Sequence, residues 1–512
     1  METKIILGPP GTGKTEYLLR RIEEELAEGT DPTRIGYFAY TVKAANEART
    51  RAMSRFQHLE KKDFMYFRTL HSLAFRQLGL TKNDVMKDEH FRELSDLLGI
   101  KLSNTNRKMD TFGFQLQDDI FAKIVDMARV RNITLKQQFQ EVGHLEGGWM
   151  KLKYIADGIT DYKKSRKLFD FTDMIIEFNE STNEEIVPKF DVFIIDEAQD
   201  LLPIQWAMVK KIMDKAARIY VAGDDDQAIF KWAGANPQDL IGLHGERYIL
   251  DKSYRVPPRI HEIATKLINK IDNRIPKVWK PKGEEKGELH FHTMRAAVYA
   301  KMDKGQWLVM TRDNYTLEQL AEEMRLRGFY YSMYGIPSVS AKKLKAINAW
   351  TDLTKRKQAI SLDNVNAIYH YMSVNRGVKY GFKTMPNADP ESLYTHENLV
   401  KKYGLMIPEH KIWHQALDRM PLREVAYIIA LLRRKENLNL EPRINLSTIH
   451  GAKGGEADNV MLLTDLPRKA DESYFNNPDD ERRVFYVGMT RAKKALHLVR
   501  SETDREFYEA FH

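Results

Sequence analysis

The residues best suited to chemistry near the N-terminus form the stretch 8–15, with the sequence GPPGTGKT. An apolar run precedes this stretch and a helical pattern follows it, which is the setting that a phosphate-binding loop G-x-x-x-x-G-K-[ST] requires. Gly11 and Gly13 allow backbone amides to turn toward an anion. Lys14 can reach the β- and γ-phosphates of a nucleotide, and the hydroxyl of Thr15 can bind Mg²⁺. The stretch therefore predicts a nucleoside triphosphate site.

Two carboxylates, Asp196 and Glu197, follow a second apolar run, Val192 to Ile195. A carboxylate at the end of a strand can hold Mg²⁺, and its neighbour can orient or deprotonate an attacking water. Acidic residues after a strand are often only a solvated turn, so this pair is informative because a phosphate-binding loop accompanies it. Together the two stretches predict nucleotide hydrolysis.

A third stretch, GDDDQAIFKWAGA at 223–235, places Gln227 five residues before Trp232. The amide could contact a phosphate, and the indole could stack on a base. A tryptophan is more often part of a core, so the indole alone predicts no ligand.

Apolar segments of strand length alternate with helical patterns along much of the chain. This alternation is typical of α/β domains in which helices cover both faces of a parallel sheet. Two polar, helix-rich stretches interrupt it, so we expect two α/β domains, each with a largely helical insertion. The expected bounds are 1–80 and 186–251 for the first α/β domain, 81–185 for its insertion, 252–340 and 441–512 for the second α/β domain, and 341–440 for its insertion.

The composition restricts the compartment more than the function. The chain of 512 residues has no cysteine, which excludes disulfides and thiolate metal sites. No apolar run approaches the roughly 20 residues of a membrane span, and there is no signal-peptide core at the N-terminus. We therefore expect a cytoplasmic protein without a membrane partner. The formal charge of +8 is compatible with a nucleic-acid partner and equally with a merely basic soluble protein.

A Thr-x-His pattern occurs twice, in RTLHSLA at 68–74 and in STIHGAK at 447–453. The recurrence is weak by itself. It is nevertheless typical of two related domains that present equivalent loops to one long ligand.

Taken together, these motifs resemble those of the UvrD/Rep/PcrA group of superfamily 1 helicases. The resemblance covers nearly the whole chain in the family's order. It implies two RecA-like domains, ATP and Mg²⁺ as cofactors, and single-stranded DNA bound across both domains. Besides GPPGTGKT and DEAQD, the matching stretches are YFAYTVKAANEAR, RTLHSLAF, FDFTDMI, GDDDQAIFKWAGA, LDKSYR, STIHGAKGGEADNV and ERRVFYVGMTRAKKALHLV.

For the ATP site, the resemblance keeps the roles of the phosphate-binding loop and the two carboxylates. It implies that Gln227 contacts the γ-phosphate or the attacking water. Tyr254 would stack on adenine, and Glu456 would contact the nucleotide sugar. Arg255 and Arg491 would place guanidinium groups at the γ-phosphate, where phosphoryl transfer spreads negative charge over the oxygens. An arginine from a second domain would also make hydrolysis depend on closure of the cleft.

For DNA, the resemblance implies a set of residues that stack on bases or bind the backbone. Stacking suits a translocase because every base has a π-face, so binding need not depend on sequence. The residues at these positions are Tyr40, Thr41, Thr69, His71, Trp232, Thr448 and His450.

The sequence departs from the family pattern at several positions. Ala233 follows the tryptophan where the family usually has arginine, and Val42 stands where asparagine is common, so we expect weaker DNA binding there. The form of the Gln227 loop resembles that of the 3′-to-5′ group. We therefore expect an ATP-dependent 3′-to-5′ helicase or translocase acting on single strands and single/double-strand junctions. The alternative is a DNA-stimulated NTPase switch or translocase that binds single strands without processive unwinding.

Overall fold

The computed structural model describes residues 2–102, 119–143, 145–283 and 285–511, which separate into two compact units. Unit 1 comprises Met1–Leu289 and Arg468–Lys494, and unit 2 comprises His290–Pro467 and Ala495–Phe511. The finer domain bounds expected from the sequence stay a prediction. Within the described residues, no helix combines the length and the apolar character that a membrane crossing would need.

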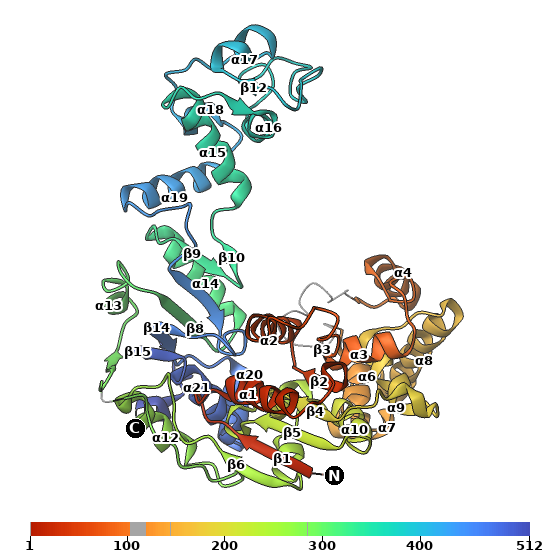
Figure 1. Cartoon of the computed structure of the whole chain (residues 1–512). Coiled ribbons are helices and arrows are strands. Elements are labelled where there is room, and N and C mark those ends of the chain that lie inside the picture. The colour runs from red at the N-terminus through yellow and green to blue at the C-terminus, as the bar shows by residue number, and fades with distance from the viewer. Residues whose placement is uncertain (1, 103–118, 144, 284, 512) are drawn as a thin grey trace. The chain divides into compact units, whose positions relative to one another are not determined.

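Unit 1 is built on a parallel sheet of six strands (Figure 1). The inner strands are continuous apolar runs because helices cover both faces of such a sheet. This confirms the expected α/β fold, and one strand coincides with the predicted run Val192 to Ile195. In spatial order the strands are β3 (Phe67–Arg68), β2 (Ile35–Phe38), β4 (Val192–Ile195), β5 (Arg218–Gly223), β1 (Glu2–Leu7) and β6 (Glu246–Ile249).

Two helices that follow strands pack on this sheet: α1 (Lys14–Ala27) and α2 (Val42–Arg55). The buried residues of α2 are three alanines at a spacing of three and four, Ala45, Ala48 and Ala52. This spacing puts them on one face, and their small size lets the helix approach its neighbours closely. The sheet therefore fixes the N-termini of both helices, which follow the predicted functional loops.

Further helices of unit 1 cover the sheet or form the stretch between β3 and β4. The described α-helices of the stretch are α3 (Leu70–Gln77), α4 (Asp88–Leu98), α6 (Ile120–Val130), α7 (Leu135–Val142), α8 (Gly148–Arg166) and α9 (Phe171–Glu180). The others are α10 (Pro203–Met213), α11 (Pro237–Ile241), α12 (Pro258–Ile268), α20 (Arg468–Asn476) and α21 (Asp479–Met489). Within the stretch between β3 and β4, an ion-pair network joins α6, α8 and α9. Arg129 and Lys163 each contact both Asp170 and Asp173.

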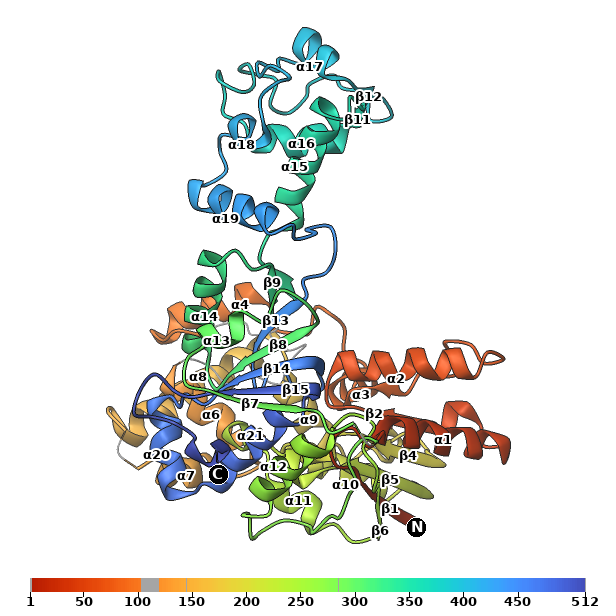
Figure 2. The same cartoon turned by 90° about the vertical axis from the view of Figure 1, so that its left-hand side faces the viewer.

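Unit 2 contains a sheet of seven strands. In spatial order the strands are β10 (Ile336–Pro337), β9 (Tyr331–Met333), β13 (Ile444–Thr448), β8 (Trp307–Thr311), β14 (Ala457–Leu463), β15 (Ala492–Val499) and β7 (Glu288–His292). Figure 2 shows the sheet from β9 to β7. The pairs β9–β13, β13–β8 and β8–β14 are parallel, whereas β9 and β10 form an antiparallel hairpin.

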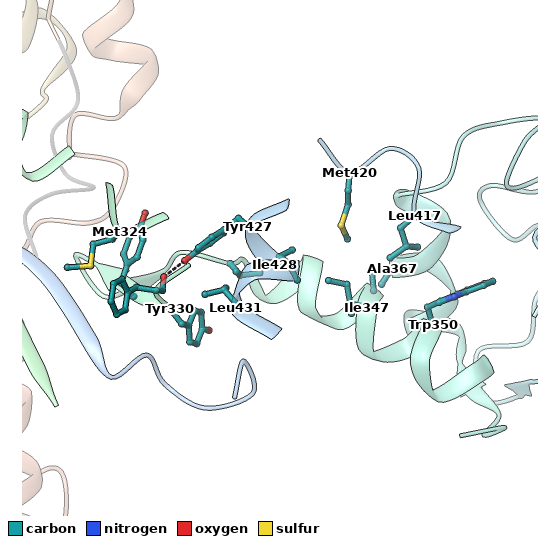
Figure 3. Close-up of a cluster of buried hydrophobic side chains, with 14 of the residues drawn as sticks. Met324, Tyr330, Ile347, Trp350, Ala367, Leu417, Met420, Tyr427, Ile428 and Leu431 are labelled. Atoms are coloured by element: carbon teal, nitrogen blue, oxygen red, sulfur yellow. Dashed lines mark hydrogen bonds between the residues drawn. The ribbon is translucent and has the colours of Figure 1, made fainter. Parts of the chain in front are cut away.

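One hydrophobic core runs through unit 2 from the sheet into its helical part. Figure 3 shows side chains of α19, among them Tyr427 and Leu431, between Tyr330 and the group around Trp350. The hydroxyl of Tyr427 donates to the carbonyl of Phe329 at 2.6 Å, which fixes α19 to the chain leading into β9. The helices are α13 (Ala296–Tyr299), α14 (Asn314–Leu326), α15 (Ala341–Thr354), α16 (Leu362–His370), α17 (His396–Lys402), α18 (Trp413–Ala416) and α19 (Leu422–Arg433), with a small hairpin of β11 (Ile360–Ser361) and β12 (Leu393–Tyr394).

Candidate nucleotide site and nucleic-acid interface

The phosphate-binding loop connects β1 to α1 in unit 1. Gly11 and Gly13 have φ angles of 72° and 80°, in the left-handed region that glycine adopts without a steric penalty. The ammonium of Lys14 donates to the carbonyl of Gly8 at 3.0 Å and lies 3.6 Å from Glu197. This ammonium and the positive end of α1 together provide the charge that a polyphosphate needs.

The segment that follows β6 packs directly on the phosphate-binding loop. The hydroxyl of Ser253 donates to the carbonyl of Pro10 at 2.8 Å, and the amide of Tyr254 donates to the carbonyl of Gly11 at 2.8 Å. A Cβ added at Gly11 would lie only 2.4 Å from the Cβ of Arg255, so only glycine fits there. The structure thus brings Tyr254, whose side chain is 66% exposed, and Arg255 next to the predicted phosphate site.

Asp196 is buried at the carboxyl end of β4, where two hydroxyl groups donate to its Oδ2. The hydroxyl of Thr15 is 3.0 Å away and that of Tyr37 is 2.7 Å away. Burial raises the pKa of Asp196, and Glu197 adds to the rise, while Lys14 and the two hydroxyls oppose it. Thr15 and Asp196 therefore offer a hydroxyl and a carboxylate oxygen side by side, which fits the oxygen ligands that Mg²⁺ prefers.

Glu197 begins a continuous chain of hydrogen bonds. Its Oε2 accepts from the amide nitrogen of Gln199 at 2.6 Å, and the amide oxygen of Gln199 accepts from the backbone N–H of Asp224 at 2.9 Å. The carboxylate of Asp224 accepts from Nε2 of Gln227 at 2.7 Å, and Oε1 of Gln227 accepts from the guanidinium of Arg491 at 2.9 Å. Side chains from three separate motifs are therefore joined.

Glu197 also has a φ of 55°, a strained conformation for a residue with a side chain.

The loop that carries Gln227 is fixed by buried ion pairs. Asp224, Asp225 and Asp226 are all buried, and Nζ of Lys277 lies 2.5 to 3.0 Å from a carboxylate oxygen of each. Burial disfavours the ammonium, but the three carboxylates outweigh this effect and raise the pKa of Lys277. Arg274 contacts Asp226 through two hydrogen bonds at 2.6 and 2.7 Å. These contacts hold the loop in one conformation, since breaking a buried pair leaves an uncompensated charge.

The helix α21 of unit 1 contacts the same loop. The guanidinium of Arg483 donates to the carbonyls of Asp225 at 3.1 Å and Asn273 at 2.9 Å. Arg491, which follows this helix, is 2% exposed and also donates to the carbonyl of Val487 at 3.0 Å. The guanidinium is thus positioned by two acceptors, one of them Gln227.

Trp232 follows Gln227 along the chain, in the 3₁₀-helix Lys231–Ala233. Its side chain is 50% exposed, so it is not a core residue. The ring of Tyr40 stacks on Phe230 with a centroid distance of 5.7 Å, and Phe230 meets Trp232 edge-on at 6.4 Å. Tyr40 is buried and packs against Phe230, whereas Trp232 is half exposed to solvent.

The other DNA residues expected in unit 1 occupy helix starts. The hydroxyl of Thr41 accepts from the amide of Ala44 and caps α2, and the hydroxyl of Thr69 accepts from the amide of Ser72 and caps α3. His71 packs edge-on against Phe171 at 6.0 Å. Burial lowers the pKa of His71 to about 4, so the ring is neutral near pH 7. These contacts are local, and a role in DNA binding at these positions stays a prediction.

Thr448, His450 and Glu456 belong to unit 2. Thr448 ends β13 and its hydroxyl accepts from the amide of Gly451 at 3.1 Å, while His450 is buried in the turn that follows. Thr69 directly follows a parallel strand and Thr448 ends one, so the two Thr-x-His stretches occupy similar places in their sheets. Glu456 is exposed just before β14.

Gln199 and Lys277 are among the residues of the site that were not predicted from the sequence. Gln199 joins Glu197 to the Gln227 loop, and its only signal was its place within DEAQD. Lys277 neutralises the three aspartates from 52 residues beyond Asp225, and no local pattern marks it.

Comparison with known proteins agrees with this arrangement. Residues 2–246 match the UvrD/REP helicase N-terminal domain, and residues 314–503 match the UvrD-like helicase C-terminal domain. The ATP-dependent DNA helicase PcrA of Bacillus subtilis is 22% identical, covering 97% of this chain and 80% of that protein. A probable DNA helicase II homolog of Rickettsia felis is 24% identical, covering 99% of this chain and 91% of that protein. UvrD2 of Mycobacterium tuberculosis is 23% identical, covering 96% of this chain and 76% of that protein. The chain therefore belongs to the UvrD/Rep/PcrA-like family of ATP-dependent DNA helicases, whose fold has two RecA-like domains.

Proposed function

We propose that this chain moves 3′ to 5′ along single-stranded DNA and unwinds duplexes at single/double-strand junctions, driven by Mg²⁺-dependent ATP hydrolysis. The observation that carries the proposal is the hydrogen-bond chain from Glu197 through Gln227 to Arg491. It connects a carboxylate beside the phosphate-binding loop to the loop that also carries the exposed Trp232.

At the ATP site, Lys14 binds the β- and γ-phosphates, and Thr15 with Asp196 would hold Mg²⁺. When bound, Mg²⁺ neutralises the charge that develops on the phosphate oxygens. Glu197 lies beside Lys14 and orients the attacking water. It takes a proton from the water as the water oxygen bonds to the γ-phosphorus and the bond from this phosphorus to the β–γ bridging oxygen breaks, which releases ADP. Arg491 supplies positive charge at the γ-phosphate, supported by Arg255, which packs on the phosphate-binding loop.

Two exposed side chains recognise the nucleotide. The exposed ring of Tyr254 stacks on adenine, and Glu456 contacts the sugar. Stacking by Tyr254 requires no new backbone conformation at the phosphate-binding loop, because the amide of Tyr254 is already bound to Gly11.

Coupling to DNA follows from the two bonds of the Gln227 side chain. A bound γ-phosphate would compete with Asp224 for the side-chain amide of Gln227, and with Gln227 for the guanidinium of Arg491. Binding and loss of the γ-phosphate would therefore change the hydrogen-bond partners of Gln227. The same loop presents Trp232, which stacks on a base of any sequence. In unit 1, Tyr40 supports Phe230 behind Trp232, and Thr41, Thr69 and His71 complete the surface. Thr448 with His450 forms its counterpart in unit 2.

The distribution of charge supports a junction as the substrate. Residues 341–440 contain 17 of the 80 Lys and Arg but only 9 of the 72 Asp and Glu. This segment alone therefore carries +8, which equals the net charge of the whole chain. A local excess of this kind favours contact with a polyanion, here the duplex arm beyond the single strand.

Strand displacement on duplexes with either a 3′ or a 5′ single-stranded tail tests the proposal. We expect ATP-dependent unwinding with the 3′ tail and an ATPase rate that rises strongly with single-stranded DNA. Lys14→Ala should abolish both activities. Unwinding from the 5′ tail alone would contradict the polarity. DNA-stimulated hydrolysis without strand displacement on either substrate would favour the alternative, an NTPase switch that binds single strands.

A further inference from the structure

The hairpin of β9 and β10 in unit 2 carries an unusual residue at its tip. Met333 pairs with Ile336, so the turn consists of Tyr334 and Gly335 alone. Their φ angles are 53° and 75°, which places both residues in the left-handed region. Two-residue turns of this kind favour Asn-Gly or Asp-Gly, because a bulky side chain is strained at positive φ. A tyrosine here costs stability, which points to a use for the ring.

The surroundings of Tyr334 place it against the Thr-x-His turn of the same unit. The amide of Tyr334 donates to the carbonyl of Leu446 in β13, two residues before Thr448. A Cβ added at Gly451 would lie 3.5 Å from the ring, in ordinary van der Waals contact, so one edge of the ring lies directly beside this turn. The phenol hydroxyl donates to the side-chain carbonyl of Asn314, the first residue of α14. The ring is therefore held at its hydroxyl and at one edge.

The tip is nevertheless open to solvent. Tyr334 is 47% exposed, and Ile336 beside it is 71% exposed. An oriented, half-exposed aromatic ring next to a loop that we assign to DNA has the properties of a base-stacking surface. Orientation matters because an ordered ring loses little further conformational freedom when a base binds.

We propose that Tyr334 stacks on a base of single-stranded DNA and is a DNA-contacting residue of unit 2 in its own right. The inference rests on the proposed function, since it requires DNA at Thr448 and His450. It assigns to the β9–β10 hairpin the stacking role that Trp232 has in unit 1.

The test compares Tyr334→Asn with Tyr334→Phe in the full chain, measuring binding of a fluorescent oligothymidylate. Asparagine suits the turn, so the melting temperature of Tyr334→Asn should equal or exceed that of the parent. Its Kd should nevertheless rise at least about fivefold, because a stacking surface is removed. Tyr334→Phe keeps the ring and should bind within about twofold of the parent. Tyr380→Asn, which removes an 83% exposed ring elsewhere in unit 2, is the matched control and should bind as the parent does.

An oligonucleotide of abasic sites separates stacking from other contacts. The parent and Tyr334→Asn should bind it equally, because it offers phosphates but no bases. A persisting difference on this ligand, an equally weakened Tyr334→Phe, or unchanged binding of oligothymidylate by Tyr334→Asn would each overturn the proposal while leaving the proposed function intact. A melting temperature of Tyr334→Asn several degrees below the parent's would overturn the strain argument and the proposal with it. Failure of the parent to bind any single strand would overturn the proposed function itself, and this inference with it.

Discussion

At the scale of single residues, Gln199 is the side chain through which Glu197 and the Gln227 loop are joined. Gln199→Met keeps the shape and removes both hydrogen bonds. We expect basal hydrolysis to change little and the stimulation by single-stranded DNA to fall, because the two ends of the network become independent. Steady-state ATPase assays with and without DNA measure this. The control is Gln205→Met, since Gln205 is also buried but its side chain accepts from the amide of Leu202, at the start of α10. An equal fall in stimulation in both variants would contradict the role of Gln199.

Arg491 makes a second prediction possible at this scale. Arg491→Ala should lower the turnover number by on the order of 10³ while changing the KM for ATP far less, because the charge is needed mainly in the transition state. Arg483→Ala, another buried arginine that contacts the same loop, should lower stability comparably but turnover much less. Measured kcat, KM and melting temperature separate the two. A change confined to KM would make Arg491 a ground-state ligand.

At the scale of elements, the stacking role proposed for Trp232, in the 3₁₀-helix Lys231–Ala233, can be tested separately from hydrolysis. Since the side chain is 50% exposed, Trp232→Ala should leave the melting temperature nearly unchanged. Hydrolysis at saturating DNA should persist because Gln227 and Arg491 remain. Base pairs unwound per ATP should fall, since stacking on a base is worth roughly 1–3 kcal/mol. Trp232→Phe should recover part of this activity. Normal unwinding by a folded Trp232→Ala protein would refute the stacking role.

The strands β7 and β15 bring three histidines together, which predicts an acid-sensitive element. The rings of His290 and His497 stack at 4.6 Å, and Nε2 of His292 lies 3.1 Å from Nδ1 of His497. Burial, the other two histidines and Lys301 lower the pKa of His497 from 6.5 to about 3. The unfolded chain therefore binds the proton more readily than the folded chain does. The contribution of neutral His497 to the free energy of unfolding is fully present above pH 6.5 and is lost as the pH falls toward 3.

Between pH 7 and pH 5, protonation of His497 in the unfolded chain should lower the free energy of unfolding by up to about 2 kcal/mol. His497→Phe should flatten the pH dependence of the denaturation midpoint over this range. The exposed His58 provides the control, because His58→Phe should leave the profile unchanged. A profile in His497→Phe as steep as in the parent would show that other groups cause it.

How far the sequence predicts these elements depends on whether the signal is local. The run Val192 to Ile195 gives β4 with its observed ends, since a strand buried on both faces must be continuously apolar. The positions of Lys14, Thr15 and Asp196 follow from motifs whose geometry the strand ends impose. By contrast, the pairing of Lys277 with three aspartates and the turn at Tyr334 depend on which distant segments meet. Thr41 and Thr69 show a further limit, because a threonine before a helix is equally typical of an N-cap.

At the scale of the whole molecule, the charge of residues 341–440 predicts how binding depends on salt. Lys355 and Lys411 are exposed in this segment. Lys355→Gln with Lys411→Gln should weaken binding to a forked duplex and reduce the log–log salt slope by about 0.9 for each phosphate that the protein no longer neutralises. Binding to a single-stranded oligonucleotide should not change. Lys61→Gln with Lys82→Gln removes the same charge from exposed positions of unit 1 and should have little effect on either ligand. Equal weakening on both ligands would contradict binding of the duplex by this segment.

The same concentration of charge also governs how fast DNA arrives. Because residues 341–440 hold the entire excess, the rest of the chain exerts no net long-range attraction on a polyanion. Electrostatic steering accelerates diffusional encounter by factors of about 10 to 10³ and fades as ionic strength rises. The helical part of unit 2 would then determine the association rate, whereas stacking on Trp232 would determine how long a captured strand stays. Added salt should therefore lower the association rate constant far more than it raises the dissociation rate constant. A variant without the stacking ring should instead dissociate faster and associate at nearly the same rate.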